Sequence, residues 1–258
     1  TEKSRIKKRK FKEEKKSFEK NIYICNFLGD IGATSVEALR DEITAILSVA
    51  GSNDEVLVIL ESAGGTVQGY GLAASQLQRI INAKIKLTVV VDKIAASGGY
   101  LMACVADNII AAPFAIIGSI GVIAQIPNFN KVLKKNDIDY EQITAGKYKR
   151  TLTLFGENTE EGRSKFQADI DRTHQIFQEF VLKRRPILDI EKVATGEYWQ
   201  AVTAKELNLV DELATSDEVI SRLIKNANVY KVKKKLKRSI YQNLFKKAES
   251  ILEYFKVY

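Results

Sequence analysis

Two short apolar runs restrict the fold of this chain more than any other feature of its sequence. Residues 55–61 (EVLVILE) and 86–92 (KLTVVVD) are almost continuously apolar, which is typical of β-strands buried on both faces. Residues 68–82, which lie between them, have the pattern of a helix. Because strand and helix patterns keep alternating, we expect an α/β fold with a mostly parallel β-sheet and right-handed crossover helices.

The remaining elements are predicted from periodicity and from start and stop signals. Thr34 and Glu37 have the spacing of a capping box, which would begin a helix that runs to about residue 49. A long helix is expected over residues 158–185, because Pro186 ends it. We also expect strands at residues 21–28, 108–112, 120–125 and 139–144, and short helices at residues 97–106, 129–135, 203–207 and 216–225.

The net charge of +8 is concentrated at the two ends of the chain. Residues 1–20 carry +6 and residues 225–258 carry +8, so the middle is acidic. We therefore expect a basic tail or membrane-proximal segment (1–20), a globular domain (21–225) and a basic amphipathic C-terminal segment (226–258). Basic ends are suited to bind an anionic membrane surface. Their charge is explained equally well if the two ends are simply solvated and keep the protein soluble. A nucleic-acid enzyme would carry positive charge on its folded domain, so we expect no nucleic acid partner.

The counts of histidine and cysteine exclude several classes of site. The one histidine, His174, excludes a His-based zinc site, and we expect no metal or cofactor. Two cysteines exclude a disulfide scaffold, and the apolar surroundings of Cys25 and Cys104 predict buried free thiols. The longest apolar stretch, residues 109–124, contains Pro113 and is shorter than the roughly 20 residues of a membrane-spanning helix.

Two loops that follow the buried strands contain residue types suited to acyl transfer. Open α/β sheets bind ligands at the carboxyl ends of their strands. In the first loop, Gly64 and Gly65 would expose backbone amides to a ligand, although a tight turn explains the pair as well. In the second loop, Ser97 is a candidate nucleophile between small residues, and it is also a candidate helix N-cap. Together the loops offer a nucleophile and oxyanion donors.

A nucleophilic Ser97 needs a general base, and the residues leave the choice open. His174 lies among apolar residues of the predicted long helix, where we expect it to be packed. A lysine is the alternative, provided that its pKa falls by roughly three units. The most suggestive candidate is Lys149, because Lys147 and Arg150 would help to lower its pKa. Solvated charge explains any of these lysines equally well.

Five segments resemble the signal peptide peptidase SppA family of serine peptidases. They are GYGLAAS (69–75), VDKIAASGGY (91–100), GSIGVI (118–123), TAGKYKRTLTL (144–154) and GENTEEGR (156–163). The resemblance covers roughly residues 21–225. It implies a ClpP/crotonase-like fold and makes the globular domain a peptidase domain.

The resemblance further implies a Ser/Lys catalytic dyad. Ser97 matches the nucleophile, Lys149 matches the general base, and Ser119 matches the hydroxyl that orients the lysine amine. Gly65 and Gly98 match the backbone amides of the oxyanion hole. Family members assemble into rings or domes in which the dyad residues can come from adjacent protomers, so the resemblance implies a homo-oligomer with a shared active site.

The function implied by this resemblance is that of a membrane-associated serine endopeptidase, with peptide substrates derived from signal-peptide remnants or other membrane-derived peptides. It implies a bacterial inner-membrane location, with the peptidase domain on the periplasmic side and the anchor helix absent from this chain. Two positions depart from the family pattern, since Ala63 replaces a common Pro and Asn208 replaces a common Gly. Neither change removes a catalytic group.

Two other functions stay open. One is a catalytically inactive, membrane-associated assembly protein of the same fold. The other is a crotonase-like acyl-CoA enzyme, which usually needs a carboxylate base in its pocket. Glu61 is the one obvious carboxylate near the two loops. Trapping of Ser97 by a serine reagent would separate the peptidase from both.

Overall fold

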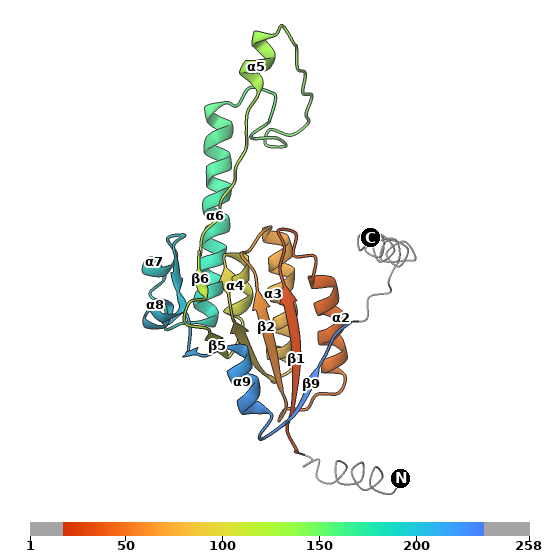
Figure 1. Cartoon of the computed structure of the whole chain (residues 1–258). Helices are drawn as coiled ribbons and strands as arrows, with labels where there is room; N and C mark the ends of the chain where they lie inside the picture. The colour runs from red at the N-terminus through yellow and green to blue at the C-terminus, as the bar shows by residue number, and fades with distance from the viewer. Residues whose placement is uncertain (1–17, 235–258) are drawn as a thin grey trace, which may run out of the picture.

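The chain forms an α/β fold around a six-stranded parallel sheet (Figure 1). The computed structural model describes residues 18–234. The strands follow the order β8-β5-β3-β2-β1-β9, and every neighbouring pair is parallel. Their bounds are β1 (Asn21–Leu28), β2 (Glu55–Glu61), β3 (Lys86–Val91), β5 (Asn108–Ala111), β8 (Glu212–Leu213) and β9 (Asn228–Lys231). This architecture confirms the predicted fold class.

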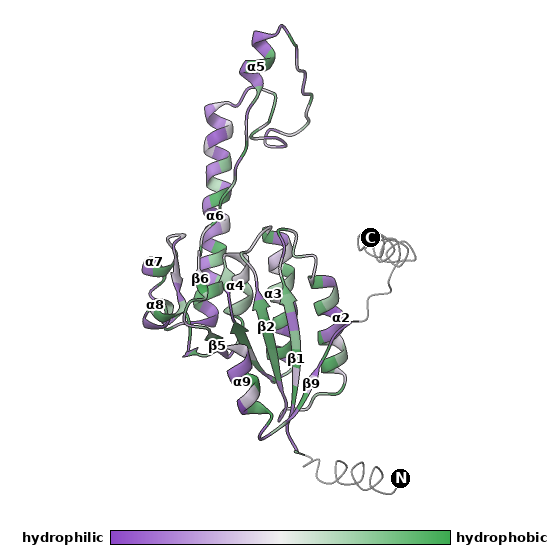
Figure 2. Ribbon diagram, viewed as in Figure 1, coloured by the Kyte–Doolittle hydropathy of each residue, from purple (hydrophilic) through white to green (hydrophobic). Residues whose placement is uncertain are grey.

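Helices cover both faces of this sheet, which explains the two apolar runs. In β2, Val58 belongs to the larger core cluster, whereas Leu57 belongs to a second cluster. Successive side chains of a strand point to opposite faces, so a strand covered on both sides is apolar throughout. Figure 2 shows β2 as mostly hydrophobic. The helices of the larger cluster include α2 (Val36–Leu47), α3 (Val67–Asn82) and α4 (Gly98–Ala103), and that of the second is α9 (Ser216–Leu223).

A smaller sheet carries the second of the two candidate loops. β4 (Ile94–Ala96) is parallel to β6 (Ile116–Gly118), which is antiparallel to β7 (Tyr198–Gln200). A parallel bridge between Ser62 and Ala95 joins the end of β2 to β4. The first loop leaves β2 and the second leaves β4, so the bridge brings the two loops together.

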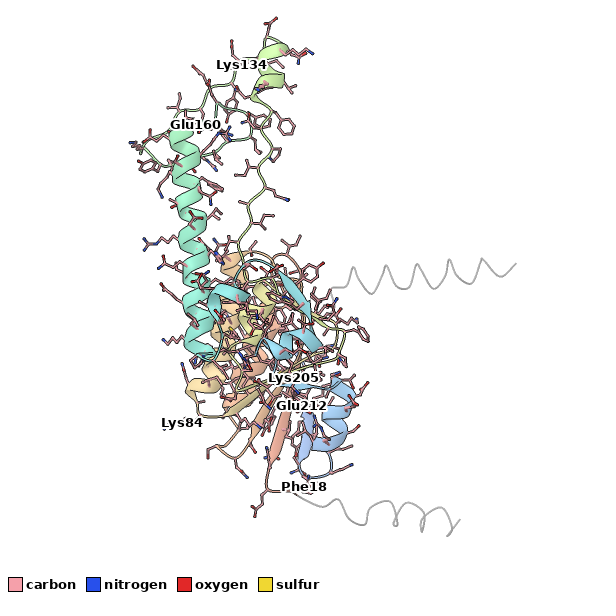
Figure 3. The ribbon with its side chains drawn as sticks, turned by 90° about the vertical axis from the view of Figure 1, so that its left-hand side faces the viewer. Phe18, Lys84, Lys134, Glu160, Lys205 and Glu212 are labelled. Carbon is pink, nitrogen blue, oxygen red and sulfur yellow. The ribbon has the colours of Figure 1, made fainter. Side chains whose placement is uncertain are left out.

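An arm, which we define as residues 122–170, extends away from both sheets (Figure 1). It contains α5 (Asn130–Lys135) and the N-terminal part of α6 (Glu160–Arg184). Lys134 and Glu160 lie near its far end (Figure 3). In Figure 2 the part of α6 that belongs to the arm is mostly hydrophilic, in contrast to the strands of the large sheet.

Two predicted strands, at residues 120–125 and 139–144, are wrong, because neither segment forms a regular strand. Both lie on or beside the arm, where no neighbouring strand from the described part of the chain offers hydrogen-bonding partners. Their apolar pattern therefore does not reflect burial within this chain. The exposed apolar residues in and next to these segments are Ile123, Ile126, Ile138, Tyr140 and Ile143.

The predicted helices are confirmed apart from small shifts at their ends, but one predicted cap is wrong. The capping box at Thr34 and Glu37 does not form, because the Thr34 hydroxyl donates to Asp30 (2.6 Å). A capping box does form at the start of α9, between Thr215 and Glu218, and it was not among the predicted features. Two further helices are α7 (Ile190–Val193) and α8 (Ala201–Glu206).

The sheet extends beyond residue 225, since β9 pairs with β1. Most of the predicted basic tail (1–20) and of the predicted amphipathic segment (226–258) lies outside the described residues. Within residues 18–234, no helix combines the length and the apolar character that crossing a bilayer requires.

Cys25 and Cys104 are both buried and free, as predicted. Burial is the largest cause that raises the pKa of each thiol, in both cases to about 12. Both thiols therefore stay protonated near neutral pH and behave as small apolar groups in the core.

A buried ion pair stabilises the end of α6. The guanidinium of Arg185, which is 7% exposed, donates to both carboxylate oxygens of Asp211 (2.7 and 3.0 Å) and to the Asn208 carbonyl (2.7 Å). Asn208 has a φ of +60°, the left-handed conformation that asparagine tolerates. We expect Arg185→Met to lower the free energy of unfolding by about 2 kcal/mol, because Asp211 loses its cation and the Asn208 carbonyl loses its donor, while the Ile109 amide still donates to one Asp211 oxygen (2.7 Å). Urea denaturation measures this loss.

Arg222 provides the control for that measurement. Its guanidinium pairs with Glu212 (2.6 Å), but the arginine side chain is 53% exposed. A solvent-exposed pair contributes about 0–1 kcal/mol. Equal losses for Arg222→Met and Arg185→Met would contradict the assignment of the larger effect to burial.

Candidate active site

Ser97 lies at the turn between β4 and α4, in a backbone conformation that few serines adopt. Its φ is +52° and its ψ is −119°. Such strain costs on the order of 1–3 kcal/mol and is concentrated at functional sites. The Ser97 amide donates to the Gly118 carbonyl (2.8 Å), which holds the turn against β6. Although Ser97 occupies the N-cap position of α4, its side chain makes no capping hydrogen bond, so the helix does not use the hydroxyl.

The loop after β2 approaches Ser97 closely because it contains two glycines. A Cβ on Gly64 would lie 2.8 Å from the Ser97 Cβ and 2.8 Å from the Gly98 nitrogen. A Cβ on Gly65 would lie 2.1 Å from the carbonyl oxygen of Ile31. Both positions therefore exclude a side chain. The glycine pair does more than form a tight turn, since Gly64 lets the loop approach Ser97 and Gly65 lets it approach the Ile31 backbone.

Two amides beside Ser97 are free to bind a ligand. Within residues 18–234, neither the Gly65 amide nor the Gly98 amide has a hydrogen-bond acceptor. Gly98 is the first residue of α4, so its amide is one of the unpaired donors at a helix N-terminus. Both glycines line the same cavity as Ser97. Two free amides next to a serine hydroxyl can stabilise the oxyanion of a tetrahedral intermediate.

The cavity beside Ser97 has a volume of about 440 Å³ and a mostly apolar wall. It lies between α3, α4, α6 and the start of the arm. The site can therefore accommodate an apolar side chain next to the hydroxyl. Its apolar lining residues include Val67, Ala74, Leu101, Val122, Phe177 and Phe180.

Ser119 lies next to Ser97 because β4 and β6 run in parallel. Their register pairs Ala96 with Gly118, so that Ser97 and Ser119 leave the sheet side by side. Ser119 also has a left-handed φ of +52°, and its amide donates to the Glu197 carbonyl (2.6 Å). The structure thus brings the predicted nucleophile and the predicted lysine-orienting residue to one edge of the sheet.

His174 has a structural contact instead of a place in the cavity. Its Nε2 lies 3.2 Å from the carbonyl oxygen of Ile120. Because a carbonyl only accepts, the ring nitrogen donates, and His174 thereby ties α6 to the segment that follows Ser119. Its neighbours Thr173 and Phe177 line the cavity, whereas His174 does not. This geometry agrees with the predicted packing role.

Lys149 lies on the arm, far from Ser97 of the same chain. Its side chain is exposed, and the neighbouring Lys147 pairs with Glu161 (2.5 Å) in the first turn of α6. The cavity at Ser97 is instead lined by Phe177, near the other end of this helix. With a rise of 1.5 Å per residue, Glu161 and Phe177 lie about 24 Å apart along α6. One chain therefore does not bring the predicted nucleophile and base together.

Glu61, on which the acyl-CoA interpretation depends, is engaged elsewhere. Its two carboxylate oxygens accept hydrogen bonds from Lys93 Nζ (3.0 and 3.1 Å). Glu61 is not among the residues that line the cavity at Ser97. The crotonase-like interpretation thus loses its one candidate base. Among residues 18–234, no three His, Cys, Asp or Glu side chains are grouped to hold a metal ion.

Comparison with known proteins identifies the family. Residues 79–230 match peptidase family S49, and residues 1–77 match the N-terminal region of the same family. The chain belongs to peptidase family S49. This result confirms the resemblance to the SppA family that the sequence motifs predict.

Curated relatives of this chain include proteins named "Probable protease SohB". The chain is 56% identical over 228 residues to the protein from Haemophilus influenzae and 59% identical over 202 residues to that from Buchnera aphidicola subsp. Schlechtendalia chinensis. These matches cover 88% and 78% of this chain, but 65% and 66% of the relatives. The chain therefore spans slightly less than two thirds of the length of these relatives.

The two S49 matches divide the candidate site between them. The N-terminal match contains the loop with Gly64 and Gly65, and the second match contains Ser97, Ser119 and Lys149. Since the division falls within α3, the site is built from both parts of the family sequence.

Two polar residues of this S49 site are not predicted from the sequence. Ser62 is 2% exposed and Tyr70 is 0% exposed, and their hydroxyls lie 2.5 Å apart behind the glycine loop. Tyr70 belongs to the segment 69–75 that carries part of the resemblance. Its spacing in a helix predicts only an aromatic residue facing the core, so no local signal indicates that its hydroxyl reaches Ser62.

Proposed function

We propose that this S49 chain is the peptidase portion of a membrane-associated serine endopeptidase that uses Ser97 and Lys149 as its catalytic dyad. The observation that carries this proposal is the strained turn at Ser97, which lines an apolar cavity together with Gly65 and Gly98, whose amides have no acceptor within residues 18–234. Ser97 Oγ attacks the scissile carbonyl carbon, and the amides of Gly65 and Gly98 stabilise the resulting oxyanion. Collapse of this intermediate breaks the peptide C–N bond, and the leaving amine takes the proton that Lys149 accepted from Ser97. Water then hydrolyses the acyl-enzyme.

Lys149 is proposed to reach the site from a second copy of the chain. The arm carries Lys149 away from the cavity of its own chain, so the cavity that it serves belongs to a neighbour. The exposed apolar side chains of the arm support such a homo-oligomer, because large exposed apolar surfaces mark interaction sites. These side chains include Ile123, Phe129, Val132, Ile143 and Phe155.

Assembly would also activate the lysine. A free lysine has a pKa of about 10.4, so only about 0.04% is neutral at pH 7. Desolvation against an apolar neighbour favours the neutral form of an amine. The Ser119 hydroxyl, placed beside Ser97 by the strand register, would accept a hydrogen bond from the amine and direct its lone pair at Ser97. The neutral amine then takes the Ser97 proton.

The substrates are proposed to be remnant signal peptides or other membrane-derived peptides. Such peptides are rich in apolar side chains, and the cavity beside Ser97 has room for one of them. The basic ends of the chain support a location against an anionic bacterial inner membrane. The periplasmic side of the peptidase domain is proposed from the family resemblance alone.

A fluorophosphonate probe, which forms a covalent bond with activated serines, tests this proposal. We expect one label per chain, on the peptide that contains Ser97. The labelling rate should rise between about pH 6 and pH 10, because Lys149 accepts the proton only when it is neutral. Heat-unfolded protein is the control, since it keeps the serine and loses the site. Labelling of another serine, or equal labelling of unfolded protein, would contradict the proposal.

A further inference from the structure

A chain of three hydrogen bonds runs behind the glycine loop. The Gly64 amide donates to Ser62 Oγ (3.0 Å), Ser62 Oγ lies 2.5 Å from Tyr70 Oη, and Tyr70 Oη donates to the Asp30 carbonyl (2.8 Å). Ser62 and Tyr70 are almost completely buried, so water does not replace these bonds. The chain therefore links the loop to the segment after β1.

The direction of this chain follows from its last member. The Asp30 carbonyl only accepts, so Tyr70 gives it the one proton of its hydroxyl. Tyr70 must then accept from Ser62, which in turn accepts from the Gly64 amide. Each hydroxyl makes one donation and accepts one bond, and this satisfies both buried groups. Burial raises the pKa of Tyr70, which keeps its hydroxyl protonated.

The ring of Tyr70 also contacts Gly98, whose amide is the second proposed oxyanion donor. A Cβ on Gly98 would lie 2.4 Å from Cγ of Tyr70, so the ring lies directly against the Gly98 backbone. Phe27 packs on the ring from another side, with the ring centroids 6.4 Å apart. One side chain thus contacts Gly98 with its ring and, through Ser62, holds Gly64 with its hydroxyl.

We infer that Tyr70 and Ser62 are positioning residues that set the Gly65 and Gly98 amides for the oxyanion. This inference rests on the proposed function. The loop itself, Ala63-Gly64-Gly65, has no side chain long enough to fix its backbone. The two hydroxyls do so from behind the loop, although Tyr70 also lines the cavity. A displacement of 1 Å at such a site can reduce the rate about 100-fold.

Tyr70→Phe and Ser62→Ala test this role, with Tyr100→Phe as a matched control. Tyr100 is also fully buried, and its hydroxyl also donates to a backbone carbonyl, that of Leu209 (3.1 Å), away from the loop. With a fluorogenic apolar peptide, we expect kcat to fall about 10- to 100-fold in Tyr70→Phe and Ser62→Ala while KM stays unchanged. Tyr100→Phe should keep its kcat although it loses a similar amount of thermal stability.

The double variant distinguishes a connected chain from two independent losses. Because Ser62 and Tyr70 act in series, Ser62→Ala combined with Tyr70→Phe should be no slower than the slower single variant. The positioning role would be overturned if the two losses in kcat multiplied in the double variant, or if both single variants kept full kcat. Provided that the wild type is active, neither outcome would affect the proposed function. A wild type without hydrolysis that depends on Ser97 would overturn the proposed function, and this inference with it.

Discussion

Replacement of Ser97 by alanine is expected to reduce kcat for casein and for a fluorogenic apolar peptide by about four orders of magnitude or more. Alanine removes the nucleophilic oxygen, and the amides of Gly65 and Gly98 cannot replace a covalent step. The fold should be unaffected, because alanine keeps the Cβ and meets the φ of +52° no less easily than serine does. Initial rates between about pH 6 and pH 10, together with thermal unfolding, measure both effects.

Ser48→Ala is the control for this experiment. Its hydroxyl donates to the Ala45 carbonyl (2.7 Å) at the end of α2 and is exposed, away from the cavity. We expect this variant to keep full activity. Unchanged cleavage by Ser97→Ala would show that another nucleophile or a contaminating peptidase acts, and the proposed mechanism would be wrong.

Lys149→Met is expected to lower kcat on the order of 10⁴-fold, the upper range for loss of a general base. Methionine has a similar length but no amine, so the Ser97 proton has no acceptor. Lys149 is exposed within its own chain, and its replacement should leave the fold of the isolated chain intact. Peptide hydrolysis and thermal unfolding check the two statements.

Co-expression of the Ser97→Ala and Lys149→Met chains tests where the dyad forms. If each site pairs Ser97 of one chain with Lys149 of the next, random mixing leaves about a quarter of the sites with both residues, and about a quarter of the activity should return. A dyad within one chain would instead give an inactive mixture. The control is Ser97→Ala co-expressed with the double variant, in which no site is complete.

The large sheet could be predicted because local pattern and burial agree there. Helices cover β2 and β3 on both faces, and their continuous apolar runs are the direct consequence. Residues 120–125 and 139–144 contain apolar residues too, yet they form no strand, because within residues 18–234 no partner strand lies beside the arm. Apolar periodicity indicates that side chains need cover, but it does not say which surface supplies it.

The candidate site could be predicted in part. Ser97 and the glycines stand out because small residues follow two buried strands, and parallel strands bring such loops to one edge. The position of Ser119 beside Ser97 depends on the register of β4 and β6, which no local pattern contains. The contact between Ser62 and Tyr70 likewise depends on how α3 packs against the end of β2.

The α/β class, the family and the residue types of a serine nucleophile with its oxyanion donors can be inferred from the sequence alone, because these follow from short segments. The large distance between Ser97 and Lys149 of one chain is visible only in the folded structure. The 25 residues of α6 form a continuous helix with a fixed rise of about 1.5 Å per residue, which holds the arm away from the cavity. The number of residues between Ser97 and Lys149 does not predict their distance in space. The direction in which α6 leaves the core depends on how its C-terminal end packs there.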